Sequence, residues 1–177
     1  IGVEINFSNG DLSTSSAVNS AYTTGFPTDK WRLISIPGNV SDNQVGNVIG
    51  DELGSQTSNT WRIFEWDDVS LSYKENPINF VNGESFWLYQ KVEDNLLISA
   101  PAGATGNMSG TTLTIKPGWN LIGSPYSFPV EMVLDQSQYF GPIAYGLSGE
   151  SWSDVTTELR PWSGYALYNR TTSDQTV

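Results

Sequence analysis

The chain of 177 residues contains neither cysteine nor histidine. These absences exclude disulfides, thiolate and imidazole metal sites, Ser-His-Asp triads and Cys-His dyads. No apolar run approaches the roughly 18–20 residues of a membrane-spanning helix, so we expect no membrane insertion. Basic residues are also scarce, since eight Lys and Arg stand against nineteen Asp and Glu, a net charge of −11. That charge repels phosphate backbones and anionic lipid, so nucleic acid is not an expected partner.

What the chain does have is an internal repeat. The segment Trp31 to Pro37 matches the segment Trp119 to Pro125 at an offset of 88 residues (119 − 31). A second block matches at an offset of 79 residues (145 − 66) without a gap. Its pairs of large apolar residues include Phe64 with Ile143, Trp66 with Tyr145, Tyr73 with Trp152, Phe86 with Tyr165, and Trp61 with Phe140. We therefore expect an N-terminal strand and Ser/Thr-rich linker (1–30), a first repeat (31–118) and a second repeat (119–177), forming one compact domain.

Two segments carry helix patterns, and most of the rest predicts strands. Ser41 to Gln44 has the form of a capping box, apolar residues at helical spacing follow it, and Gly54 stands where a C-terminal glycine is expected. Residues 128–134 predict a shorter second helix. Runs of β-branched and aromatic residues bounded by Gly, Pro, Asn or Asp predict strands in both repeats. The predicted fold is mainly β, with two pseudo-repeats of strand, short helix and strands in a shared sandwich or partly closed barrel.

The repeated sequence motifs resemble those of a known protein family. The sequence WNLIGSP at residues 119–125 and the sequence GYALY at residues 164–168 resemble a repeat of large secreted and surface proteins of bacteria. In that repeat a "WNLIGxP" strand precedes a "Y-D-x(n)-Y" hairpin and a "G-x-G-Y-W" strand. Residues 66–73 match the hairpin, although the second copy has Gly146 in place of the Asp. The resemblance covers most of the chain and implies an extracellular or cell-surface, modular and non-catalytic role.

Three aromatic residues are candidate ligand contacts. Residues that are large and apolar in both repeats are best explained as core: Trp31, Trp66, Tyr73, Phe86, Trp119, Tyr145, Trp152 and Tyr165. Trp87 and Trp162 lack an aromatic counterpart, so the common scaffold does not require them. Trp162 lies in a Pro-Trp-Ser-Gly turn, where a ring is more often exposed. Together with Tyr126 they form the predicted sugar-binding set, and the alternative is packing against the helices or a neighbouring domain.

Acidic residues gather around the two predicted hairpins. Glycoside hydrolysis needs only two carboxylates, so the absence of histidine does not exclude it. The carboxylates that cluster there are Glu65, Asp67, Asp68, Glu150 and Asp154. Asp67 and Asp68 are also candidate ligands of a structural Ca²⁺, although the spaced pattern of an EF-hand loop is missing. Acidic residues in turns usually bond to the backbone, which argues against catalysis by these carboxylates. We expect no cofactor other than this candidate structural Ca²⁺.

These observations favour an extracellular non-catalytic accessory module that binds polysaccharide or mediates cell-surface adhesion. The alternative is a structural spacer that contacts only neighbouring domains of a large surface protein. A glycoside hydrolase that uses a carboxylate pair is less favoured. The chain starts at Ile1 and not at Met, as expected of a mature or excised segment of a longer protein.

Overall fold

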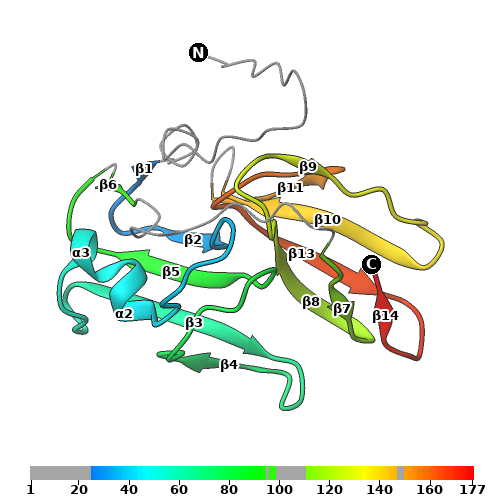
Figure 1. Cartoon of the computed structure of the whole chain (residues 1–177), viewed down its shortest axis with the longest axis horizontal. Helices are drawn as coiled ribbons and strands as arrows, with labels where there is room; N and C mark the ends of the chain where they lie inside the picture. Colours follow the sequence, from blue (N-terminus) through cyan, green and yellow to red (C-terminus); the bar gives the residue numbers. More distant parts are fainter. Residues whose placement is uncertain (1–24, 95, 99–110, 147–149) are drawn as a thin grey trace.

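The computed structural model of the chain describes residues 25–94, 96–98, 111–146 and 150–177. Two four-stranded antiparallel sheets carry most of the fold and lie next to each other (Figure 1). The prediction of a mainly β fold is confirmed, with sandwich-like packing, and no sheet among the described residues closes into a barrel. The strand expected at residues 3–7, and the linker up to residue 24, lie outside the described residues.

The first sheet contains four strands in the order β2-β5-β3-β4. They are β2 (Trp31–Ile34), β5 (Phe86–Gln90), β3 (Trp61–Asp67) and β4 (Ser72–Glu75). Because side chains alternate between the faces of a strand, the residues of β5 show which face of the sheet is buried. Phe86 and Leu88 are buried on one face, whereas Trp87 and Tyr89 remain half-buried on the other. We call these the core face and the aromatic face.

The second sheet repeats this strand order as β8-β13-β10-β11. Its strands are β8 (Gly118–Gly123), β13 (Gly164–Asn169), β10 (Tyr139–Tyr145) and β11 (Trp152–Val155). Trp66 pairs with Tyr73 in the first sheet, and Tyr145 pairs with Trp152 in the second, as the 79-residue offset aligns them. We therefore refer to a first and a second half. A duplication as the origin of the two halves stays a prediction.

Smaller elements surround the two sheets. Three two-stranded pairs are β1 (Gly25–Phe26) with β6 (Leu96–Leu97), β9 (Val130–Glu131) with β12 (Glu158–Leu159), and β7 (Thr114–Ile115) with β14 (Gln175–Thr176). Two single-turn helices follow β2: α2 (Val45–Val48) and α3 (Gly50–Leu53). Across the described residues, no helix has the length and apolar character needed to cross a membrane.

The first predicted helix exists, but it begins later than expected. The prediction of Ser41 as N-cap is wrong, because α2 begins after Gln44. Asp42 Oδ1 accepts a hydrogen bond from the Gln44 backbone N–H at 3.1 Å, so the aspartate stabilises the entry. The expected apolar positions are buried: Val45, Val48, Ile49 and Leu53. Gly54 ends α3 with φ of 67°, the conformation for which a glycine was expected.

The second predicted helix is wrong. Residues 128–134 contain β9, which pairs with β12. Val130, Met132 and Leu134 pack against the second core, while the residues between them are exposed. The segment therefore buries every second side chain, which is the period of a strand. An apolar run this short fits both periods, and pairing with β12 satisfies backbone groups that a single turn would leave open.

A β-bulge also corrects the alignment of the repeats. The register between β10 and β13 shifts between Phe140 and Ile143. As a result the buried Tyr139 takes the place of the buried Trp61, and the match of Trp61 with Phe140 is wrong by one residue. Phe140 instead occupies the position of Arg62, since each pairs with the corresponding tyrosine of the neighbouring strand. One inserted residue thus moves an aromatic ring onto the opposite face of the sheet.

Each half has its own core, but one side chain crosses over. The first core contains residues of the first half, from Phe26 to Ile98, together with Trp162 of the second half. The second core contains Ile115, Ile122, Tyr139, Ala144, Leu159, Tyr165 and Leu167. Trp162 therefore joins the second half to the interior of the first.

The two halves meet where equivalent positions face each other. A Cβ added to Gly123 would lie 2.0 Å from the Cβ of Ser35, which is 88 residues earlier (123 − 35). A Cβ added to Gly164 would lie 2.8 Å from the Cβ of Ser85, which is 79 residues earlier (164 − 85). Contact between equivalent positions is the geometry of a twofold axis. The halves are therefore related by a pseudo-twofold axis that passes through this junction.

Hydrogen bonds link the halves beside that axis. The Ser35 hydroxyl donates to the Ser163 carbonyl at 2.8 Å in a buried environment. On the other side, three bonds join residues 83–85 to residues 121–123: Ser85 N–H to Leu121 O at 3.2 Å, Gly123 N–H to Gly83 O at 2.9 Å, and Ser85 Oγ to Ile122 O. Because these groups are withdrawn from water, separating the halves would leave polar atoms without partners.

Candidate functional site

The three predicted ligand contacts do not form one surface. Trp162 is 2% exposed and belongs to the first core, so the expectation of an exposed ring in its turn is wrong. The turn lies at the junction of the halves, which explains why its ring enters the neighbouring core. Tyr126 is half-buried, its ring lies 5.3 Å from that of Phe128, and its hydroxyl accepts a hydrogen bond from the Thr111 N–H.

Trp87 is the one member of that set at the centre of an aromatic surface. Its ring centroid lies 4.8 Å from that of Tyr145 and 5.9 Å from that of Trp152, both in the second half. Its indole N–H donates to the hydroxyl of Tyr73 at 3.2 Å. Trp87 thus fills the space between the β3–β4 hairpin and the β10–β11 hairpin. Packing between halves accounts for a ring at this position without a counterpart in the second repeat.

Eight rings, Trp87 among them, form a continuous surface, which we call the aromatic strip. Its members are Trp31, Phe64, Trp66, Tyr73, Trp87, Tyr89, Tyr145 and Trp152. Tyr73 and Trp152 are 50% and 42% exposed, and the other six are half-buried. From Tyr89 the contacts run through Trp31 at 5.1 Å and on to Trp87 at 6.5 Å. Beyond Trp87 the strip continues into the second half.

A second, smaller group of rings lies at the far end of the second sheet. We call it the end row: Trp119, Tyr168 and Phe140, which are 45%, 36% and 39% exposed. The three residues pair across β8, β13 and β10.

The expectation that rings retained in both repeats form the core is therefore wrong for most of them. Phe86 and Tyr165 are buried as expected. The six others lie outside both cores: Trp31, Trp66, Tyr73, Trp119, Tyr145 and Trp152. The physical reason is strand alternation, because a repeat preserves both faces of a strand and not the buried face alone.

Two groups beside the aromatic strip, Arg62 and Tyr89, have acidic partners. Arg62 Nε lies 2.7 Å from Glu75 Oε1, and the guanidinium also stands 4.9 Å from the centre of the Phe64 ring. The hydrogen bond between them raises the pKa of Arg62 and lowers the pKa of Glu75. The Tyr89 hydroxyl donates to Asp29 at 2.8 Å, which raises the pKa of that tyrosine. Arg62 at the border of the strip is therefore compensated, while the Lys91 ammonium stands 5.7 Å from the centre of the Tyr89 ring.

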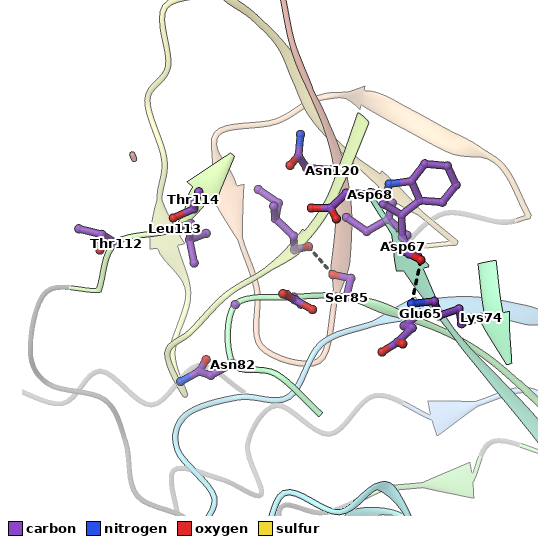
Figure 2. A pocket seen from close by; sticks show the side chains of 15 residues that line it. Glu65, Asp67, Asp68, Lys74, Asn82, Ser85, Thr112, Leu113, Thr114 and Asn120 are labelled. Carbon is purple, nitrogen blue, oxygen red and sulfur yellow. Dashed lines mark hydrogen bonds and ion pairs between the residues drawn. The ribbon is translucent and has the colours of Figure 1, made fainter. Parts of the chain in front are cut away.

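A pocket of about 400 Å³ opens at the junction of the halves (Figure 2). Strands β3 and β4 form one wall, and the segments around β7 and β8 form the other. Its polar and charged lining residues are Glu65, Asp67, Asp68, Lys74, Asn82, Glu84, Ser85, Thr112, Thr114 and Asn120. The group of carboxylates predicted around the hairpins is thus divided, since Glu65, Asp67 and Asp68 line this pocket whereas Glu150 and Asp154 do not.

Lysines neutralise two of the pocket carboxylates. Lys74 lies 2.8 Å from Asp67, and Lys116 of the second half lies 2.6 Å from Asp68. The bond from Lys74, followed by bonds from Ser70 and the Val69 N–H, holds the pKa of Asp67 well below its usual range. A Ca²⁺ bound by Asp67 and Asp68 would have to displace both ammonium groups. Among the residues that the structure describes, no three carboxylates are arranged to hold a metal ion.

Glu84 is the pocket carboxylate that the sequence did not indicate. Withdrawal of its carboxylate from water raises the pKa of Glu84, and the charges of Glu65 and Asp68 raise it further, while Lys116 lowers it. It follows Gly83 in a turn, outside both hairpins, so no acidic pattern indicates it. The pocket therefore combines one carboxylate that holds its proton more tightly than usual with one that holds it less tightly.

Sequence reasoning also missed the end row. Phe140 was aligned with the buried Trp61, and Trp119 was expected in the core. A sequence signal could have found them: each of three neighbouring strands has an aromatic residue at the same position along the strand.

No protein-family model, curated protein or solved structure matches this chain.

Proposed function

We propose that this chain is an extracellular, non-catalytic module that binds polysaccharide along the aromatic strip. The observation that carries the proposal is the continuity of eight accessible rings across both halves. The faces of aromatic rings carry partial negative charge, whereas the C–H groups of a pyranose carry partial positive charge. Rings 5–7 Å apart therefore offer a succession of stacking positions for consecutive sugar units.

The charges of the protein favour an uncharged polysaccharide over an anionic one. Arg62 is neutralised by Glu75, and Lys30 lies 3.6 Å from Glu150 at the other border of the strip. The whole chain carries a net charge of −11, so a polyanionic polysaccharide would be repelled at long range. An uncharged polysaccharide does not need a free cation for binding, and the net charge of the chain does not repel it. A surface or secreted location and a modular role are the parts of this proposal that the family resemblance supports.

Affinity electrophoresis in gels that contain neutral polysaccharides tests the proposal. Wild-type protein should be retarded by at least one of a β-glucan, a xylan and a galactomannan. Tyr73→Ala and Trp152→Ala each remove an exposed ring and should weaken binding about tenfold, or ~1.4 kcal/mol. Val133→Ala is the control, since Val133 is exposed outside the strip. Equal retardation of all variants would contradict the assignment of the strip.

The structural spacer is the second candidate, and the junction favours it. Trp162 in the first core and the buried Ser35–Ser163 bond fix the halves to each other, as a rigid spacer requires. If wild-type protein binds none of the polysaccharides, the spacer becomes the better account. The glycosidase alternative depends on Glu84 and Glu65 in the pocket, and release of reducing sugars that is lost in Glu84→Gln would support it.

A further inference from the structure

We propose that the end row (Trp119, Tyr168 and Phe140) is a second polysaccharide-binding site, which makes the module bivalent. The inference rests on the proposed function of the aromatic strip, because both sites would use the same stacking chemistry. It adds a separate site that contains none of the strip residues.

The three rings form a short, accessible platform. Trp119 is paired with Tyr168, and Tyr168 with Phe140, so the side chains stand next to one another across three strands. The ring centroid of Trp119 lies 5.1 Å from that of Tyr168 and 6.2 Å from that of Phe140. These separations are close to the length of one sugar unit in a polysaccharide. The row therefore has room for about two to three units.

The middle of the sheet face separates this row from the strip. Phe140 and Tyr145 both lie on β10, five residues apart, which corresponds to about 16 Å along a strand. Between them, Ile143 and Ala166 are paired and are only 9% and 3% exposed. The first half lies over this region, because Leu33 reaches Gly164 in β13. A short oligosaccharide on the end row therefore does not reach the strip.

The area of the row favours a glycan over a protein partner. Three aromatic side chains of roughly 200 Å² each, exposed by about two fifths, offer on the order of 250 Å². A stable protein interface needs about 800 Å² from each partner. Toward the middle of the sheet, the neighbouring residues on this face are the uncharged Leu121 and Ala166. At the other end of the row, the exposed Arg170 follows Tyr168 by two residues. A small surface formed by three aromatic rings suits a neutral sugar chain.

The corresponding position in the first half shows what the bulge adds. There the row consists of Trp31, Tyr89 and Arg62, and Arg62 is occupied by Glu75. In the second half the bulge brings Phe140 to the place of Arg62. The second half thereby gains a third ring and loses a charge at one position.

Two separated sites have a measurable consequence. A short sugar binds each site independently, whereas a long polysaccharide bridges the sites of different molecules or engages both sites of one. Linked binding raises the apparent affinity by about 10² to 10⁴ over either site alone. We therefore expect two equivalents of a trisaccharide per chain, and crosslinking of the long polysaccharide.

Isothermal titration with a trisaccharide cut from the best-binding neutral polysaccharide tests this inference. Wild type should bind two equivalents, Trp119→Ala and Trp152→Ala one each, and the double variant none. Phe140→Arg restores the first-half residue and should also bind one. It provides a second variant if Trp119→Ala does not fold by circular dichroism. Turbidity of the long polysaccharide should be lost in each single variant.

The outcomes separate the two proposals. If Trp119→Ala and Phe140→Arg keep the wild-type stoichiometry while Trp152→Ala loses one equivalent, the end row is wrong and the strip stands. If only the end-row variants lose binding, the strip is wrong. Sedimentation gives the remaining outcome: a wild-type dimer that Trp119→Ala converts to monomer, with unchanged sugar binding, would assign the row to a second copy of the chain and overturn the inference.

Discussion

The two halves have the same strand order but fill their shared junction differently. At each place where equivalent positions meet, the first half has the larger residue: Ser35 faces Gly123, and Ser85 faces Gly164. The reverse holds at the turn, where Gly83 in the first half corresponds to Trp162 in the second. This comparison shows that a pseudo-twofold axis cannot carry equal side chains at its centre, because interiors are close-packed.

The aromatic faces differ in a related way. Trp87 has the counterpart Ala166, and only Trp87 reaches across to the opposite hairpin. The strip therefore crosses the junction on one side of the axis, while on the other side the aromatic residues form the separate end row. Asymmetry at the axis thus joins the rings of the first half to Tyr145 and Trp152 of the second half, and leaves the end row separate.

Removal of the side chain that crosses over should have the largest effect. Trp162→Ala would leave a cavity in the first core, and such truncations cost about 3–5 kcal/mol. Urea unfolding monitored by circular dichroism measures this loss. Trp119→Ala removes the same side chain from an exposed position and should change the free energy of unfolding by less than about 1 kcal/mol. Equal losses in the two variants would show that Trp162 does not support the first core.

Making the junction symmetrical should have the next largest effect. Gly123→Ser gives the second half the residue of the first, but its Cβ would lie 2.0 Å from that of Ser35. We expect a loss of about 1–3 kcal/mol in unfolding free energy, as for overpacking in other interiors. The double variant Ser35→Gly with Gly123→Ser exchanges the two residues and should recover part of this loss. Strictly additive effects would contradict a direct contact between the two positions.

The sequence predicted the positions of most strands correctly, but it predicted less well which face of each strand is buried. The alternation in Phe86 to Tyr89 and the two offsets were sufficient to align β2 with β8 and β5 with β13. The short apolar run at residues 128–134 was not sufficient, because helix and strand periods both fit it. The bulge before Ile143 was not visible either, so Phe140 was assigned to the wrong face.

The candidate sites were harder to predict from the sequence than the strands, because they depend on contacts between the halves. Trp87 was identified because it lacks an aromatic counterpart, and it lies at the centre of the strip. The same argument failed for Trp162, since a missing counterpart also arises where a residue packs across the junction. Glu84 and the end row require the register of neighbouring strands, which the sequence does not state.

The smallest expected effect concerns pH and the pocket. Because the folded state raises the pKa of Glu84 above its ordinary value of 4.5, ionisation of this group opposes folding. The penalty is absent below pH 4.5, where the group is protonated in both states. It grows as pH rises from 4.5 to the folded pKa and then stays constant. Much of Glu84 is exposed, so solvent screens its neighbours and the penalty is small.

Glu84→Gln should therefore stabilise the protein slightly at pH 7, by up to about 0.5 kcal/mol, and leave its stability unchanged near pH 3.5. Thermal unfolding at both pH values measures the difference. Glu131→Gln is the matched control, since Glu131 is exposed on β9 outside the pocket. Asp67 acts in the opposite sense, because its lowered pKa contributes stability above pH 3.8 that is lost as the pH falls. A stabilisation of Glu84→Gln that persists at pH 3.5 would show that charge in the pocket is not its cause.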